Sequence, residues 1–215
     1  AIKETLDANG MDNDTHIRLT LTRGEKVTSG MDARLNQSGS CLIVLAEWKK
    51  KVYDFSKGIR AISSSIRRSI PAFLDSKIHH NNMLSLVIAK IHANIAGYDA
   101  AVMLDDRGFV AELNDTNLFM LKGDTVFTPF AHACLPGITR QTFIDILKEN
   151  KMKVQERDLS LVEFINADLV FATGTNGEIT PVTEMDGREI KCNMKFLEKI
   201  KNLFELKLPN LCEPL

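Results

Sequence analysis

The segment Ala133–Arg140, which reads ACLPGITR, has residue types and an order that could support chemistry. Phe143, Ile144 and Leu147 follow it at helical spacing and predict a helix that begins directly after Gly137. The first N–H groups of a helix have no partner within the helix, and they lie at the positive end of its dipole. The segment therefore predicts an anion site, for which a phosphate group is a suitable ligand.

A second polar loop, Thr173–Gly177, reads TGTNG and lies between two expected strands, Leu169–Ala172 and Glu178–Val182. Its hydroxyl groups and unpaired amides could surround an anion. Turns between strands often have this composition. On local pattern alone, each of the two loops is therefore more often a plain connection than a binding site.

Lys77 lies in the stretch DSKIHHNN, between an expected strand and an expected helix. A lysine in such a place is more often a solvated surface residue than one that forms a Schiff base. His79 and His80 suggest a metal, but adjacent residues of an extended segment point to opposite faces, and no carboxylate cluster completes a ligand set. We therefore reject a metal site here.

The spacing of apolar residues predicts the elements that must position these side chains. The remaining expectations are strands at Ile17–Arg23, Cys41–Trp48 and Gly58–Ile66, a helix at Asn82–Ala96, strands between Ala100 and Phe130, a helix at Ile138–Lys148, strands from Leu169 to Ile190, and a helix at Met194–Phe204. Strands and helices do not follow each other in strict βαβ order. We therefore expect an α+β fold of mostly antiparallel sheet with packed helices.

The run Lys49–Gly58, KKKVYDFSKG, interrupts the apolar pattern with charge and a glycine. Such a break is typical of a domain junction, and a solvated hairpin loop is the alternative. The four cysteines lack C-x-x-C spacing, which disfavours a zinc site or a disulfide framework and suits a reducing compartment.

Composition limits the possible partners and locations. The 215 residues include 27 basic and 28 acidic side chains, so bulk charge draws the chain neither to nucleic acid nor to a membrane surface. No apolar run approaches the roughly 20 residues needed to span a bilayer. We expect a cytoplasmic protein. The chain begins with Ala1 rather than methionine, so an organellar location stays open.

Four stretches together resemble one known family, the class IV (fold-type IV) aminotransferases, which use pyridoxal 5'-phosphate. The stretches are LDSKIHHNN, the following MLSLVIAKIHANIAGYDAAVMLDDRGFVAELNDTNLFML, ACLPGITR, and VFATGTNGEITPVTEMDGREI. The resemblance runs from about His16 to Ile190. It implies an α+β fold with a remnant of a small N-terminal α/β domain at 1–50, an interdomain linker at 51–57, and a large, barrel-like, mostly antiparallel cofactor-binding domain at 58–215.

The resemblance also implies a role for each motif. Lys77 matches the lysine that carries the cofactor and moves the substrate proton, and Glu112 matches the glutamate that pairs with the pyridine nitrogen. The other residues implied for cofactor binding are Leu135, Gly137, Ile138, Thr139 and Thr175. Those implied for substrate binding are Arg18, Thr175 and Asn176.

The implied reaction is transamination of branched-chain or similar apolar L-amino acids with 2-oxoglutarate, by a homodimer. Arg18 stands in the strand pattern of branched-chain enzymes, whereas the R-x-H pair of D-amino-acid enzymes is not visible after Arg23. A D-amino-acid aminotransferase and an aminodeoxychorismate lyase are the alternatives within the same family.

The sequence departs from the family pattern at three places. Family members begin with further strands that carry an arginine for the phosphate, whereas the resemblance here starts partway through that domain. Asn82 or Met83 replaces the tyrosine that follows the lysine in branched-chain enzymes, and KCNMKF at Lys191–Phe196 replaces a G-x-V-T turn. A truncated, non-catalytic relative is therefore the second hypothesis, although joint retention of Lys77 and Glu112 with the two threonines named above favours an enzyme.

Overall fold

A computed structural model describes residues 1–212, so 213–215 of the expected large domain lie outside the described residues. The chain divides into two compact units, Ala1–Lys51 and Val52–Cys212, which are described separately below. None of the helices within 1–212 is long and apolar enough to cross a membrane.

The first unit is small and built around one antiparallel strand pair. It contains helix α1 (Ile2–Asn9), strand β1 (Thr15–Thr22), a 3₁₀ turn (Ala33–Leu35) and strand β2 (Cys41–Trp48). The register of the pair places Arg18 opposite Leu45. Several large apolar side chains of both strands are exposed, namely Leu19, Leu21, Leu42, Ile43 and Leu45. A two-stranded sheet with so much exposed apolar surface is only marginally stable alone.

The second unit is built on a nine-stranded sheet with the order β5-β4-β3-β10-β9-β6-β7-β8, in which β11 also pairs with β10. The strands are β3 (Ile59–Arg67), β4 (Ala100–Leu104), β5 (Val110–Leu113), β6 (Asn117–Lys122), β7 (Thr125–Thr128), β8 (Lys153–Glu156), β9 (Leu169–Gly174), β10 (Glu178–Met185) and β11 (Arg188–Glu189). The helices are α2 (Leu84–Ile95), α3 (Ile138–Glu149), α4 (Leu161–Ile165) and α5 (Met194–Lys207), with a 3₁₀ turn at Leu208–Asn210.

Most neighbouring strands are antiparallel, which confirms the expected fold class. Strand β3 is nevertheless parallel to β4 and to β10, and β7 is parallel to β8. Parallel neighbours need a long crossover connection, and α2 provides it between β3 and β4 while α3 provides it between β7 and β8.

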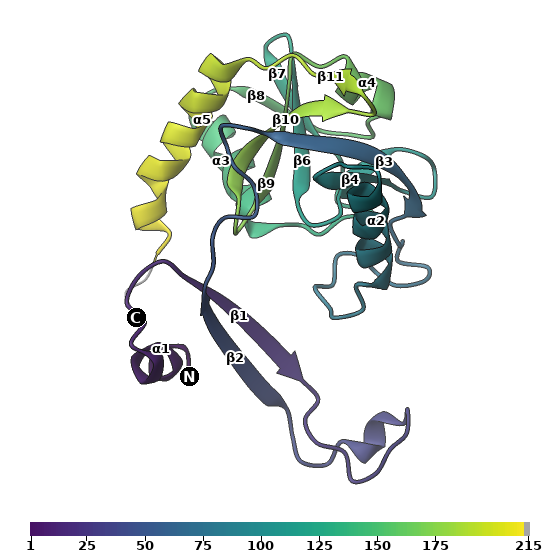
Figure 1. The fold of residues 1–215 in the computed structure, drawn as a ribbon, viewed down its shortest axis with the longest axis vertical. Coiled ribbons are helices and arrows are strands. Elements are labelled where there is room, and N and C mark those ends of the chain that lie inside the picture. Colours follow the sequence, from purple (N-terminus) through teal and green to yellow (C-terminus); the bar gives the residue numbers. More distant parts are fainter. Residues whose placement is uncertain (213–215) are drawn as a thin grey trace. The chain divides into compact units, whose positions relative to one another are not determined.

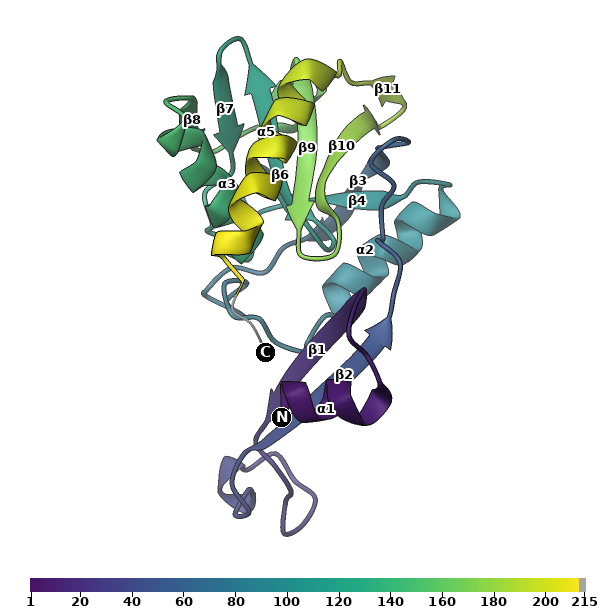
Figure 2. The ribbon, with the colours of Figure 1, turned by 90° about the vertical axis from the view of Figure 1, so that its left-hand side faces the viewer.

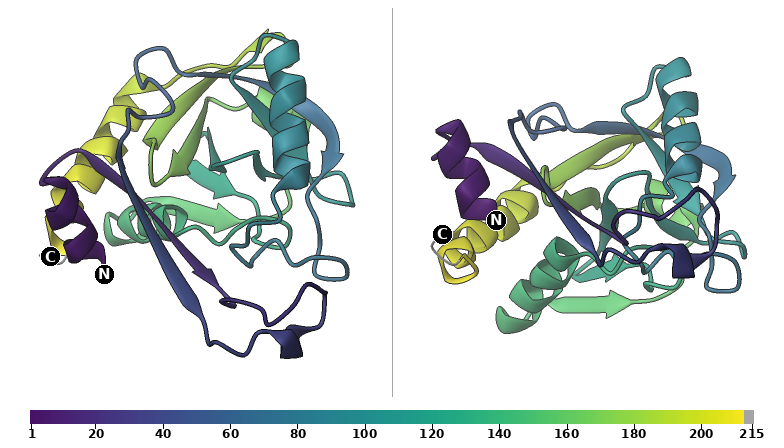
Figure 3. Two further views of the ribbon diagram at one scale, coloured as in Figure 1. Left: turned by 60° about the horizontal axis from the view of Figure 1, so that its bottom comes forward. Right: turned by 90° about the horizontal axis from the view of Figure 1, so that it is seen from below.

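Successive side chains of a strand point to opposite faces of the sheet. Here both sets are apolar, so the sheet has an apolar core on each face. In β6, Leu118 and Met120 join the core enclosed by the curled sheet, whereas Phe119 and Leu121 face helices α3 and α5. Helices α3 and α5 lie side by side against β6 and β9 (Figure 2). Helix α2 lies on the other flank of the strands (Figure 3).

Helix α2 lies beside β3 and β4 (Figure 1). It packs on them mainly through its smallest side chains. Ala89 and Ala93 are fully buried against Ala101 and Met103. Apart from Leu86, which packs beside the alanines, several large residues of α2 are exposed, namely Leu84, Val87, Ile91 and Ile95. The alanines allow the helix to approach the sheet closely, so the bulky residues remain available for other contacts.

Candidate active site

Glu112 is the buried carboxylate at the centre of the candidate site. Strand β5 places it opposite Met103 of β4, and only 8% of its side chain is exposed. Its Oε1 lies 2.8 Å from Nε of Arg68, and its Oε2 accepts a hydrogen bond of 3.1 Å from Nδ2 of Asn117. A buried carboxylate needs such partners, because an unpaired charge is very costly away from water.

The surroundings of Glu112 set its protonation. Burial raises the pKa of its carboxyl group to about 7, and the adjacent guanidinium of Arg68 opposes this increase. Glu112 can therefore exchange a proton close to neutral pH, as a group that shares a proton with a basic ring nitrogen must do.

The raised pKa of Glu112 predicts how stability depends on pH. The folded protein binds this proton more tightly than the unfolded chain, in which the pKa is near 4.5. The contribution of Glu112 to stability is therefore complete below about pH 4.5 and is lost as the pH rises to about 7. We expect a loss of about 3 kcal/mol across this window, from 1.36 kcal/mol per pKa unit.

This loss is measured by urea unfolding of the cofactor-free protein between pH 4 and pH 8. Glu112→Gln cannot titrate, so the difference between wild type and variant isolates the contribution of this side chain. A matched control is Glu149→Gln, which removes an exposed carboxyl group. Equal pH slopes for wild type and Glu112→Gln would contradict the prediction.

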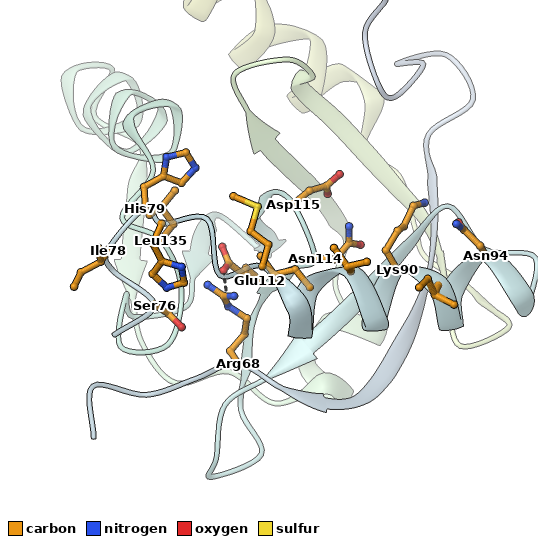
Figure 4. A pocket seen from close by; sticks show the side chains of 15 residues that line it. Arg68, Ser76, Ile78, His79, Lys90, Asn94, Glu112, Asn114, Asp115 and Leu135 are labelled. Atoms are coloured by element: carbon orange, nitrogen blue, oxygen red, sulfur yellow. Dashed lines mark ion pairs between the residues drawn. The ribbon is translucent and has the colours of Figure 1, made fainter. Parts of the chain in front are cut away.

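A cavity of about 540 Å³ opens beside Glu112 (Figure 4). Its polar wall contains the side chains of Arg68, Glu112, Asn114 and Asp115. The rest of the lining is mostly aliphatic and comes from α2, the segment that precedes it and the turn before α3, with Ser76, Ile78, His79, His80, Met83, Leu86, Val87, Lys90, Ile91, Asn94 and Leu135. A mostly apolar cavity with a few convergent polar groups is the usual form of a small-molecule site.

Lys77 itself does not belong to this lining, although both of its neighbours, Ser76 and Ile78, do. Its amine lies 3.7 Å from a carboxylate oxygen of Asp75, and 46% of its side chain is exposed. The amine of Lys90 lies along the cavity wall and donates a hydrogen bond to the carbonyl of Asp99. In this conformation Lys77 therefore lies outside the cavity lining.

The expected anion site lies at the turn before α3, and its role stays a prediction. Helix α3 begins at Ile138, and its N-terminal cap, Gly137, makes no side-chain hydrogen bond within residues 1–212. The N–H groups of the first turn, including that of Thr139, therefore have neither a helical partner nor a side-chain cap. Ile138 is 87% exposed, so the approach to these N–H groups is open.

The loop between β9 and β10 carries Thr175 and Asn176. Thr175 is exposed, whereas the Oδ1 atom of Asn176 accepts a hydrogen bond of 2.7 Å from the N–H of Val52. At the end of β9, the buried hydroxyl of Thr173 has no hydrogen-bond partner among the described residues. Thr173 pairs with Asn117 of β6, so this loop starts beside the residue that contacts Glu112.

Asn117 links three of the motifs that the sequence singled out. Its Nδ2 donates to Glu112 and, at 2.9 Å, to the carbonyl of Leu135 in the turn before α3, while its strand partner leads into the Thr173–Gly177 loop. Sequence reasoning missed Asn117. The available signal was the asparagine at the start of the apolar run NLFML. A polar side chain that is buried with such a strand, as Asn117 is, needs hydrogen-bond partners.

Tyr53 and Asp115 form a second contact that sequence reasoning missed. The Tyr53 hydroxyl donates to the carboxylate of Asp115, with oxygen distances of 2.8 and 2.9 Å. Loss of hydration raises the pKa of both groups, and the negative charge of Asp115 raises that of Tyr53 further. The contact ties the start of the second unit to the polar wall of the cavity.

Arg18 belongs to the first unit, and the other expected site residues belong to the second. Arg18 is exposed on β1. Its role toward a substrate carboxylate stays a prediction, as do the roles of the other expected site residues.

Comparison with known proteins identifies the family. The model for class IV amino-transferases matches residues 1–185. Branched-chain-amino-acid aminotransferase-like protein 2 of Arabidopsis thaliana is 54% identical over 190 residues, which are 88% of this chain and 34% of that protein. A putative branched-chain-amino-acid aminotransferase of Methanocaldococcus jannaschii is 38% identical over 209 residues, 94% of this chain and 71% of that protein.

A solved structure agrees with these relatives. The branched-chain amino acid aminotransferase from Escherichia coli has a TM-score of 0.82 and 30% identity, and the match covers 94% of this chain and 67% of that one. The chain belongs to the class IV aminotransferases. Within that family, the relatives named above are branched-chain aminotransferases or resemble them by name. The chain spans about a third of the length of the Arabidopsis relative.

The residues present fit pyridoxal 5'-phosphate, the cofactor of this family, and a similar solved branched-chain aminotransferase is complexed with N-(5'-phosphopyridoxyl)-L-glutamate. The cofactor has a basic ring nitrogen, a phosphate and an aldehyde. Glu112 is a buried carboxylate suited to the nitrogen, the uncapped start of α3 suits the phosphate, and Lys77 offers an amine for the aldehyde. The buried hydroxyl of Thr173, which has no partner among the described residues, is a further polar group beside Asn117 and the turn before α3.

Proposed function

We propose that the protein is a pyridoxal-phosphate-dependent aminotransferase that transfers the amino group of branched-chain or similar apolar L-amino acids to 2-oxoglutarate. The main observation in support is the position of buried Glu112, which lies beside the cavity and is joined through Asn117 to the turn that begins α3. The proposed ring-nitrogen partner and the proposed phosphate site are thus parts of one hydrogen-bonded network.

When bound, the cofactor withdraws electrons from the substrate Cα so that its proton can leave. The carboxylate of Glu112 keeps a proton at the ring nitrogen, which strengthens that withdrawal. The free N–H groups at the start of α3 bind the phosphate and orient the ring. Lys77 would serve as the general base that takes the proton from Cα and as the general acid that gives it back.

The aliphatic part of the cavity supports an apolar substrate side chain. Leu86, Val87 and Ile91 of α2 line it together with Leu135. An apolar pocket separates substrates by only about 1–3 kcal/mol per methylene group. We therefore expect overlapping activity toward valine, leucine and isoleucine.

The substrate class is tested with the full-length protein, assayed with L-leucine, D-alanine and aminodeoxychorismate. We expect turnover of L-leucine with 2-oxoglutarate as acceptor. Turnover of D-alanine alone, or pyruvate release from aminodeoxychorismate alone, would assign the protein to another branch of the family. A purified protein without the visible absorbance band of bound cofactor would instead favour the non-catalytic relative.

Assembly is the second property that we propose, as a homodimer of the full-length protein. The exposed Leu84 and Ile95 of α2, which do not line the cavity, and the exposed strands of the first unit support an assembly that covers apolar surface. We expect sedimentation of the full-length protein to give the mass of a dimer, and the 215-residue chain alone to aggregate. A monodisperse monomer of this chain with bound cofactor would contradict both expectations.

A further inference from the structure

Each carboxylate oxygen of Glu112 contacts a side-chain N–H donor, and each donor also forms a hydrogen bond with the segment 133–135, which leads into α3. Arg68 places its Nε 2.8 Å from Oε1 and donates through the same atom to the carbonyl of Ala133 at 3.1 Å. Asn117 donates through Nδ2 to Oε2 at 3.1 Å and to the carbonyl of Leu135 at 2.9 Å. Glu112 and the segment 133–135 are therefore connected twice, each time through a single side chain.

The amide of Asn117 is also confined on its other side. Its Oδ1 lies so close to Gly137 that a Cβ at that position would be only 2.3 Å away. Real Cβ atoms essentially never come this close to another heavy atom, so the amide and a side chain at residue 137 exclude each other. The backbone before α3 can take its observed path beside Asn117 because residue 137 is glycine.

We propose that Asn117 is a positioning residue that couples Glu112 to the N-terminus of α3. The two N–H bonds of its Nδ2 have a fixed geometry, so one donor to each side sets the separation between the carboxylate and the turn. A rigid cofactor needs this separation, since its ring nitrogen and its phosphate must be bound at once. The last point rests on the proposed function, but the coupling itself belongs to the protein without cofactor.

Hydrogen exchange in the cofactor-free full chain tests the coupling directly. If Asn117 transmits the position of Glu112, then Glu112→Ala should increase exchange at the first hydrogen-bonded amides of α3, residues 141–144, at least about tenfold. In an Asn117→Ala background, exchange there should already be fast, and adding Glu112→Ala should increase it by less than it does in the wild type, because only the connection through Arg68 remains. Such non-additivity is the sign of two residues in one network.

Two comparisons separate coupling from general loss of stability. Exchange in α5, Met194–Lys207, should change little in any of these variants, because α5 contacts α3 through apolar side chains such as Phe204 and the hydrogen bonds of Glu112 and Asn117 named above do not reach it. Asn166→Ala is the matched control, since it also removes one bond from an asparagine side chain to a backbone carbonyl, at α4. If Asn117→Ala does not fold, Gly137→Ala should displace the same amide and give the same fast exchange at α3.

Unchanged exchange at α3 in Glu112→Ala, or additive effects of the two substitutions, would overturn the proposal. Binding of pyridoxine 5'-phosphate, which lacks the aldehyde and needs no bond to Lys77, distinguishes this failure from failure of the proposed function. If pyridoxine 5'-phosphate binds but exchange is not coupled, the proposed function is supported and the proposed role of Asn117 is wrong. If exchange is coupled but pyridoxine 5'-phosphate does not bind, the role of Asn117 is supported and the proposed function is wrong.

Discussion

Replacing Lys77 by alanine is expected to lower transamination by the full-length protein at least about a thousandfold, because a positioned general base contributes about 10²–10⁴-fold and the covalent attachment of the cofactor is lost as well. Lys77→Arg should be nearly as inactive, since a guanidinium does not release its proton near neutral pH. Steady-state rates with L-leucine and 2-oxoglutarate measure both effects. Lys153→Ala, which removes an exposed lysine from β8, serves as the control.

The attachment point of the cofactor provides an independent measurement. Borohydride reduction of the wild type, followed by peptide mapping, should place the pyridoxyl group on Lys77. Because Lys77 does not line the cavity in this conformation, such a label would mean that its side chain moves when cofactor binds. A label on Lys90, which lines the cavity, or on Lys57 would show that another lysine has this role.

Glu112→Gln is expected to keep the cofactor bound but to slow removal of the substrate proton by about 10²–10³-fold, the usual cost of removing one electrostatic group from an active site. A neutral amide cannot keep the ring nitrogen protonated, but its oxygen can still accept from Asn117, so we expect the proposed phosphate site at α3 to persist. Stopped-flow absorbance after addition of L-leucine measures the step. Glu149→Gln again serves as the control, and an unchanged rate in Glu112→Gln would mean that Glu112 has only a structural role.

The long helices of the second unit were predictable from sequence. The expected helices at Asn82–Ala96 and Ile138–Lys148 correspond to α2 and α3, Leu84–Ile95 and Ile138–Glu149. Apolar spacing and the flanking glycines, Gly97 after the first and Gly137 before the second, are local signals. Such signals depend on residues a few positions apart, so they need no knowledge of the rest of the fold.

Three short elements were missed: α1, β8 and α4. Helix α4 had a readable signal, since Ser160 and Glu163 form a capping box around its first turn. Strand β8 had none, because KVQE is not a typical strand sequence and forms only by parallel pairing with β7. The difference is physical, since a cap is local whereas strand pairing depends on a distant partner.

The buried face of α2 was decided by tertiary structure. The helical spacing of Leu84, Val87 and Ile91 is a standard signature of a core face, yet these residues are exposed and Ala89 and Ala93 are buried. A helix that is apolar on most sides does not specify which face meets the sheet. The close approach to β3 and β4 selects the alanines.

The sequence by itself determined the family, the fold class and the order of the motifs, because these depend on residue identity and local spacing. Tertiary structure decided what each motif touches. The pairing of Arg68 with Glu112, the two bonds of Asn117 and the contact of Tyr53 with Asp115 all join residues that different strands or loops bring together. The pKa of Glu112 follows from that burial, since a side chain's charge state depends on the water and the charges that the complete fold places around it.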